Sequence, residues 1–113
     1  MIKVFISQPM RNKTDKEIEK ERDRAIIDIM RTVGEDIDVI QSFFKGANHE
    51  EKPLWYLGKS FELLSKADIA YFCTDWDKNR GCRMEHMAAE LYGIEIMEAE
   101  IEKQDRTKNS TFW

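Results

Sequence analysis

The stretch IKVFISQPMRNKTDKEI, residues 2–18, decides the fold prediction because it contains a strand and the start of a helix. Residues 2–7, IKVFIS, form a short apolar run rich in β-branched side chains, which predicts a buried strand. A polar loop follows this run. Thr14 and Glu17 then stand three residues apart, as in the capping box that begins many helices.

The helix that starts after Thr14 is predicted by an apolar stripe at helical spacing and by a glycine at its end. The stripe consists of Ile18, Arg22, Ala25, Ile26, Ile29, Met30 and Val33, and Gly34 follows it. The same reasoning predicts strands at 37–40, 68–73 and 94–97, a helix at 54–64, and a helix at 82–92 in which Met84, Met87, Ala88 and Leu91 recur at helical spacing. Strands and helices therefore alternate along the chain.

This alternation predicts an α/β fold with a Rossmann-like (flavodoxin-like) parallel sheet of four to five strands and helices on both faces. We expect one domain over residues 1–98 and a polar C-terminal tail over 99–113, in which Phe112 and Trp113 could contact a neighbouring molecule. Ligands of such sheets bind at the carboxyl ends of the strands. The loops after the first three predicted strands are therefore the candidate site.

Composition excludes several classes of function. The chain has 113 residues and a net charge of −4, which argues against a general nucleic-acid binder, since such a protein needs a basic face. Two cysteines are too few for a disulfide scaffold or a four-ligand structural zinc site, and free thiols fit a reducing cytoplasm. The N-terminal run is too short for a signal peptide, and no apolar run is long enough to span a membrane. We expect a cytoplasmic protein without a membrane partner.

Glu85 is the first candidate for chemistry, because it lies near the start of the last predicted helix, just past the strand-three loop. A carboxylate there can face a pocket, but a solvated helix residue that complements the helix dipole has the same position. Cys82 could be a nucleophile at a helix N-terminus, or a small structural residue. His86 is adjacent to Glu85 in sequence and so points elsewhere, and His49 is the other histidine.

The loop before Glu85 offers candidate ligand contacts. Gly81 allows close backbone approach, and Arg80 could pair with a phosphate, although a tight turn with an exposed arginine fits as well. Trp76 could stack on a base or pack against the core. Asp75 and Asp77 flank it at a spacing that is no metal signature, and we expect no metal. We also expect no cofactor.

Three segments, KVFISQPMRNKTDKEI, LWYLGKSFELLSKADIAYF and WDKNRGCRMEHMAAELYGIEI, carry a resemblance that covers nearly residues 1–97. Together they resemble a family of small bacterial and phage proteins of unknown function. That family is similar to the nucleoside 2-deoxyribosyltransferase superfamily. The link to the transferases rests on the strand-one loop with its proline, the Ala-Asp pair that opens strand three, and a Gly-x-x-x-Glu step.

The resemblance implies cleavage of the N-glycosidic bond of a nucleoside or nucleotide, or deoxyribosyl transfer, with Glu85 as the nucleophile. It implies that Ser7, Gln8, Pro9 and Met10 lie against the base or sugar. Asn79, Arg80 and Gly81 would then lie near the sugar or its phosphate, with Asp75 and Trp76 in the same loop. It also implies a homodimer or a larger homo-oligomer.

One departure from the transferase pattern leaves a second function open. The transferases often carry an acid about eight residues before the Ala-Asp aspartate, and Ser60 stands there in this chain. A serine is a weaker orienting group without charge. A nucleotide sensor or sponge that uses the same pocket without turnover is therefore the alternative. A third hypothesis is an interaction protein with a vestigial pocket, whose partner surfaces are the charged first helix and the aromatic tail.

Overall fold

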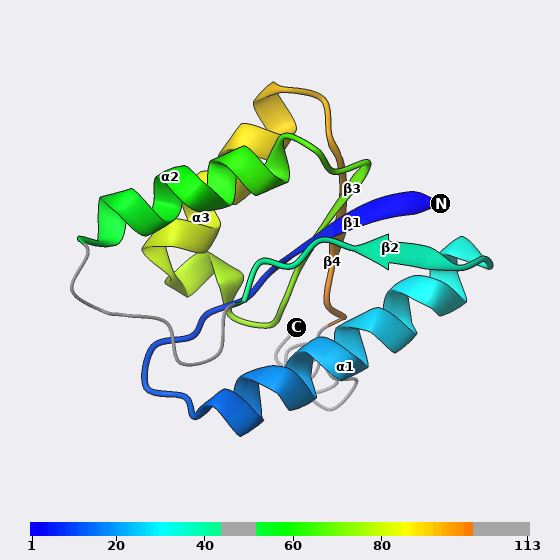
Figure 1. Ribbon diagram of the computed structural model, residues 1–113, viewed down its shortest axis with the longest axis horizontal. Coiled ribbons are helices and arrows are strands. Elements are labelled where there is room, and N and C mark those ends of the chain that lie inside the picture. The colour runs from blue at the N-terminus through cyan, green and yellow to red at the C-terminus, as the bar shows by residue number, and fades with distance from the viewer. Residues whose placement is uncertain (44–51, 101–113) are drawn as a thin grey trace, which may run out of the picture.

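The computed structural model describes residues 1–43 and 52–100, and its elements alternate as the sequence predicts (Figure 1). The strands are β1 (Ile2–Ser7), β2 (Ile37–Val39), β3 (Ile69–Phe72) and β4 (Glu95–Glu98); the helices are α1 (Asp15–Val33), α2 (Pro53–Leu64) and α3 (Arg80–Leu91), with a 3₁₀ turn, η1 (Trp76–Lys78). The predicted tail lies outside the described residues from position 101 onward, as does His49.

The four strands form one parallel sheet in the order β2-β1-β3-β4. The α/β parallel-sheet prediction is therefore confirmed, with four strands. Figure 1 shows α1 on one side of the sheet and α2 with α3 on the other. None of the described helices is long and apolar enough to cross a membrane.

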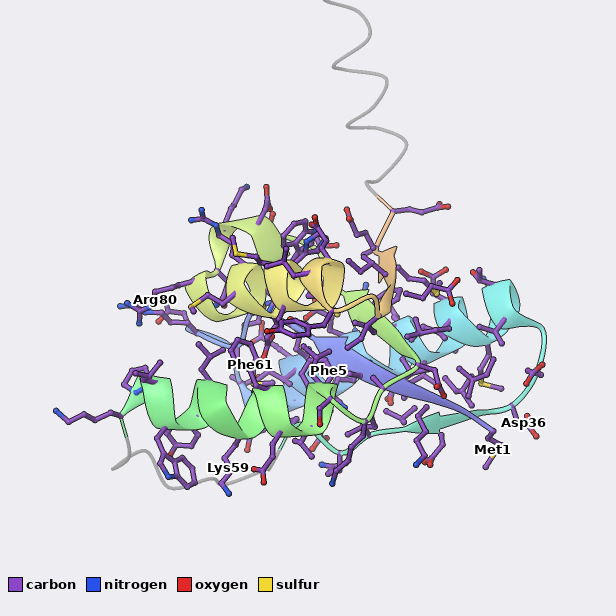
Figure 2. All side chains as sticks on the ribbon, turned by 90° about the horizontal axis from the view of Figure 1, so that it is seen from above. Met1, Phe5, Asp36, Lys59, Phe61 and Arg80 are labelled. Carbon is purple, nitrogen blue, oxygen red and sulfur yellow. The ribbon has the colours of Figure 1, made fainter. Side chains whose placement is uncertain are left out.

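One buried cluster lies on each face of the sheet, between the strands and the helices that cover that face. Two clusters form because successive side chains along a strand point to opposite faces. Val4 and Ile6 of β1 pack toward Ala25 and Ile29 of α1. Phe5, between them in sequence, belongs to the opposite cluster with Phe72 of β3, Leu64 of α2 and Ala89 of α3; Phe61 packs at its margin. In the view of Figure 2, the labelled Phe5 and Phe61 lie between α2 and α3.

Helix α1 has the ends that the sequence predicts. The Thr14 hydroxyl accepts a hydrogen bond from the Glu17 N–H, and the Glu17 carboxylate accepts one from the Thr14 N–H. This is the predicted capping box. Gly34 ends the helix with φ 76°, and its N–H donates to the Met30 carbonyl. Only glycine adopts this left-handed conformation without steric cost.

Asp68, just before β3, ties that strand to β1. The Lys3 N–H donates to the Asp68 carboxylate at 2.8 Å, and the Asp68 N–H donates to the Lys3 carbonyl at 2.8 Å. These two bonds explain an acid at the start of a buried strand without a catalytic role.

Helix α3 differs from its prediction in its start and in the face that it buries. It begins at Arg80, two residues earlier than predicted, because the Asn79 side chain accepts a hydrogen bond from the Cys82 N–H and so caps the helix. The predicted apolar stripe is largely exposed: Met84, Met87 and Leu91 face away from the core. The buried face consists of Cys82, Glu85, His86 and Ala89.

Candidate functional site

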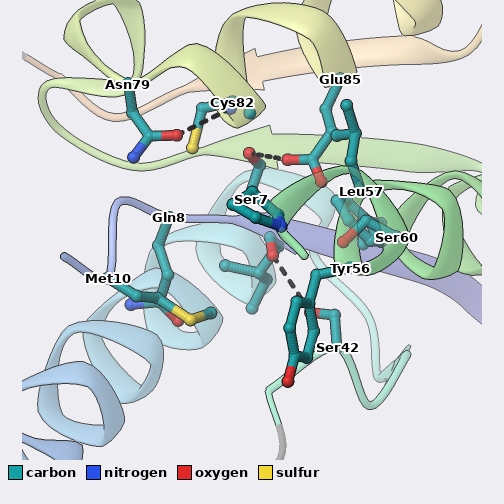
Figure 3. A pocket seen from close by; sticks show the side chains of 14 residues that line it. Ser7, Gln8, Met10, Ser42, Tyr56, Leu57, Ser60, Asn79, Cys82 and Glu85 are labelled. Atoms are coloured by element: carbon teal, nitrogen blue, oxygen red, sulfur yellow. Dashed lines mark hydrogen bonds between the residues drawn. The ribbon is translucent and has the colours of Figure 1, made fainter. Parts of the chain in front are cut away.

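A cavity of about 180 Å³ lies at the carboxyl end of β1, between that strand and the helices α2 and α3 (Figure 3). This is the sheet edge at which parallel α/β folds bind ligands. Its lining comprises Phe5, Ile6, Ser7, Gln8, Met10, Ser42, Pro53, Tyr56, Leu57, Ser60, Asn79, Gly81, Cys82 and Glu85. The structure thus brings together Glu85 and five of the predicted ligand contacts, namely Ser7, Gln8, Met10, Asn79 and Gly81.

Glu85 is a buried carboxylate at the cavity wall, with 7% of its surface exposed. The Ser7 hydroxyl donates to its Oε1 at 2.7 Å, as Figure 3 shows. Burial raises the pKa of Glu85 above its ordinary value, while hydrogen bonds from the Ser7 and Ser60 hydroxyls act to lower it. The solvated-helix interpretation of this residue is therefore excluded by its burial.

The two hydroxyls that act to lower the pKa of Glu85 come from different elements. Ser7 ends β1 and is 2% exposed, so its side chain is fixed by the strand. Ser60 lies on α2, lines the same cavity and acts to lower the pKa of Glu85. Ser60 therefore brings a neutral hydroxyl, and no charge, to the side of the cavity that α2 forms.

Replacing Ser7 with Ala is expected to raise the pKa of Glu85 further, because the substitution removes a hydrogen bond that stabilises the ionised carboxylate. Titration of a ¹³C-labelled Glu85 carboxyl by NMR measures this shift. Ser42→Ala is the matched control, since Ser42 lines the same cavity but its hydroxyl donates to the Ile6 carbonyl. Equal titration of Glu85 in wild type and Ser7→Ala would contradict the role assigned to Ser7.

Gln8 lines the cavity, but its amide group is already engaged. Its Nε2 donates to the Ile18 carbonyl at 3.2 Å and to the Glu21 carboxylate at 2.9 Å. Its Oε1 accepts from Arg22 at 3.2 Å. Both amide hydrogens are therefore used within the protein. Gln8 holds the β1 loop against α1 and shapes the cavity with its side chain.

Arg22 is a buried cation behind this wall, with 7% of its surface exposed. Besides Gln8 it donates to the Ser42 hydroxyl at 3.2 Å and to the Ile40 carbonyl at 3.5 Å. Burial lowers its pKa. No carboxylate within residues 1–43 and 52–100 forms an ion pair with it. A buried positive charge with neutral partners favours a negatively charged group nearby.

The segment 79–81 has a different arrangement from the predicted loop. Asn79 and Gly81 line the cavity, but the Asn79 side chain is the cap of α3. Arg80 is exposed and lies outside the cavity lining, and Figure 2 shows it pointing away from the molecule. The Asn79 side chain therefore already accepts from one of the free N–H groups at the start of α3, next to the place where the sugar or its phosphate was expected.

Trp76 packs against the protein instead of facing the cavity. Its ring stacks on His86 with centroids 3.9 Å apart and planes 5° apart, and it also contacts Phe72. Asp75 forms an exposed ion pair with Lys78. Neither Trp76, Asp75 nor Pro9 is part of the cavity lining. Core packing, the second interpretation of Trp76, matches this position.

Cys82 lines the cavity as a buried thiol. Burial raises its pKa to about 11, so the reactive thiolate is scarce at neutral pH. His86 lies on another part of α3, where its ring nitrogens contact Glu90 at 2.7 Å and Glu98 at 3.1 Å. Cys82 therefore has the position of a small structural residue.

Helix α2 supplies a cavity wall that the sequence analysis missed. Pro53, Tyr56 and Leu57 line the cavity together with Ser60. Counted from Pro53, the other three residues follow at three, four and seven positions, which places all of them on one face of a helix. That spacing was the available signal, but the sequence analysis used the periodicity of this segment only to predict a helix. Ser42 follows β2 and lies in the loop after the second predicted strand, which the sequence analysis included in the candidate site without singling out this residue.

Comparison with known proteins supports the fold alone. No family model and no curated protein matches the chain. A solved structure of a conserved protein from Enterococcus faecalis V583 superposes with a TM-score of 0.62 at 14% sequence identity. The match covers 87% of this chain and 62% of that chain, so this chain spans less than two thirds of its structural neighbour. At this identity the likeness extends to the α/β architecture and no further.

Proposed function

We propose that the protein cleaves the N-glycosidic bond of a nucleoside or nucleotide, or transfers its deoxyribosyl group, with Glu85 as the nucleophile. The observation that carries this proposal is a buried carboxylate at the wall of a cavity, held by the Ser7 hydroxyl at 2.7 Å. A carboxylate fixed beside a bound sugar can attack its anomeric carbon.

The proposed step proceeds by displacement at the anomeric carbon. An ionised oxygen of Glu85 bonds to that carbon while the carbon–nitrogen bond to the base breaks. The bonding electron pair leaves with the base nitrogen, which takes up a proton from water. A water molecule, or a second base, then displaces Glu85 from the sugar and restores the carboxylate. Because the nucleophile must be ionised, the raised pKa of Glu85 makes the rate increase with pH across its titration.

The cavity also has features suited to a nucleoside. Met10, Tyr56 and Leu57 offer apolar and aromatic surface for a base, and the hydroxyl of Ser42 lies near the same wall. Arg22 lies behind Gln8 and Ser42, and its positive charge favours a phosphorylated ligand at this end of the sheet.

A nucleotide sensor or sponge without turnover is the second candidate. The observation that favours it is that Glu85 is the sole carboxylate among the described cavity-lining residues. Glycosidases generally use two carboxylates, one of them as a general acid or base. With Ser60 in place of a supporting acid, proton transfer to the leaving base falls to water or to the base itself.

One experiment separates the two candidates. Wild type and Glu85→Gln are incubated with a panel of ribo- and deoxyribonucleosides and their monophosphates, and free base is measured by chromatography. The enzyme hypothesis predicts base release by wild type alone. Thermal stabilisation by a nucleotide that is recovered intact supports the binding function instead. Neither base release nor stabilisation over the panel would contradict both.

Two further expectations belong with this proposal. Both cysteines are free and buried, as suits action in a reducing cytoplasm. The resemblance to the transferases favours a homo-oligomer.

A further inference from the structure

Helix α3 exposes an apolar stripe on the side opposite its buried face. Met84, Met87 and Leu91 are 43%, 62% and 74% exposed. They are separated by three and four residues, so they form one continuous row along the helix. Single exposed apolar residues are ordinary, but a row of three long side chains on one helix indicates a contact surface.

Two opposite charges border this stripe on the same side. Arg83 lies four residues before Met87 and Glu90 three residues after it, so both neighbour Met87 on the helix surface. Arg83 is exposed and forms no ion pair with any described residue. The Glu90 side chain is 60% exposed, and its Oε1 contacts His86 Nδ1. The stripe therefore has a positive end and a negative end.

We infer that α3 pairs with α3 of a second copy of this chain, antiparallel and about a twofold axis near Met87. Such an axis places Met87 against its own copy and Met84 close to Leu91 of the other chain. It also keeps the bordering charges on one side, so that Arg83 lies opposite Glu90 of the partner helix, twice by symmetry. The surface is thus self-complementary in shape and charge.

Charge selects this arrangement over others. A parallel twofold pair would place the two copies of Arg83 on opposite sides of the interface, and likewise the two copies of Glu90, so that neither residue would meet an opposite charge across it. Antiparallel helices also oppose their dipoles. The pairing leaves Glu85 on the buried side of α3, so it does not depend on the proposed catalytic function. A 12-residue helix buries less area than a permanent dimer needs, so we expect concentration-dependent dimerisation.

Sedimentation velocity of the full chain over a concentration series tests the inference. Wild type is expected to dimerise, and Met87→Asp to raise the dissociation constant at least about ten-fold, because two carboxylates would meet at the axis. The matched control is Ile27→Asp, an exposed apolar residue on α1 that should leave association unchanged. Circular dichroism confirms that each variant folds.

A charge exchange then tests the antiparallel geometry. Arg83→Glu and Glu90→Lys are each expected to weaken the dimer at least several-fold, and the double variant to restore it. A wild type that stays monomeric at the highest soluble concentration overturns the inference, including the case in which the chain's own tail covers the stripe. Unchanged association in Met87→Asp also overturns it, and a double variant without recovery overturns the antiparallel pairing.

Discussion

Glu85→Gln is expected to make the protein more stable at neutral pH while abolishing turnover. Burial disfavours the charged carboxylate, as its raised pKa shows, and the neutral amide removes this penalty. The amide oxygen can still accept the hydrogen bond from Ser7. We expect a stabilisation on the order of 1 kcal/mol, equivalent to about 4–8 °C in Tm for a domain of this size. The amide cannot form the glycosyl-enzyme, so base release should fall on the order of 10³-fold or more.

The sign of the pH dependence follows from the direction of the shift. The native state holds the Glu85 proton more tightly than the unfolded chain does. The free energy of unfolding of wild type therefore falls as pH rises from the unfolded pKa through the native pKa. Glu85→Gln has no carboxyl group at this position, so its free energy of unfolding does not show this fall with pH. The stability difference should be largest above the native pKa and should shrink as pH falls toward the ordinary value of 4.5.

Thermal unfolding of both proteins across this pH range measures the difference. Glu62→Gln on α2 is the control, because that side chain is 67% exposed and forms only a surface ion pair with Lys59. Exposed pairs contribute little, so its Tm should stay close to that of wild type at every pH. A constant offset between Glu85→Gln and wild type, independent of pH, would show that the carboxylate is not the source of the penalty.

The parts of the fold that the sequence predicted well are those with strong local signals. The β1 run and the α1 capping box are each formed by residues that lie close together in the sequence, and both are present as predicted. The buried stripe of α1 is also present, with Ile18, Arg22, Ala25 and Ile29 toward the sheet. Local hydrogen bonds and hydrophobic periodicity determine these features, so they are accessible from sequence.

The errors lie where tertiary packing decides between faces. Helical spacing cannot tell which of two faces of α3 is buried, since Cys82, Glu85 and Ala89 recur with the same period as Met84, Met87 and Leu91. Trp76 was similarly ambiguous, because its partner His86 belongs to another element. A polar residue such as Glu85 on the buried face is itself the informative observation.

The candidate site could be predicted only in part, because its contacts join residues that are far apart in the sequence. Sheet topology placed the site at the strand ends, and both the position of Glu85 near the start of the last predicted helix and the resemblance indicated this residue. The surrounding contacts could not be predicted: Ser7 reaches Glu85 across 78 positions, and Arg22 reaches Ser42 across 20. Such contacts depend on the relative placement of α1, α2 and α3, which no local pattern specifies.

Arg22→Ala is expected to lower the free energy of unfolding by about 2–4 kcal/mol. The substitution removes the donor from the Gln8 amide oxygen, the Ser42 hydroxyl and the Ile40 carbonyl. A buried acceptor that is left without a donor has given up its hydrogen bond to water without a replacement, and this desolvation penalty destabilises the folded state. The lost side chain also leaves a cavity beneath α1. Urea unfolding followed by circular dichroism measures the change, and Arg24→Ala, an exposed neighbour on α1, should differ little from wild type.

Arg22→Met separates the two contributions to this loss. Methionine fills most of the volume but donates no hydrogen bond, so its destabilisation reports the unmet acceptors. If Arg22→Met is as stable as wild type, the burial penalty of the guanidinium equals what its hydrogen bonds contribute, and the residue is not structural. In that case Arg22 would make no net contribution to stability, and binding of a negatively charged ligand would explain why the protein has a buried cation at this position. Loss of nucleotide-induced stabilisation in Arg22→Met, with the fold intact, would assign this charge to phosphate binding.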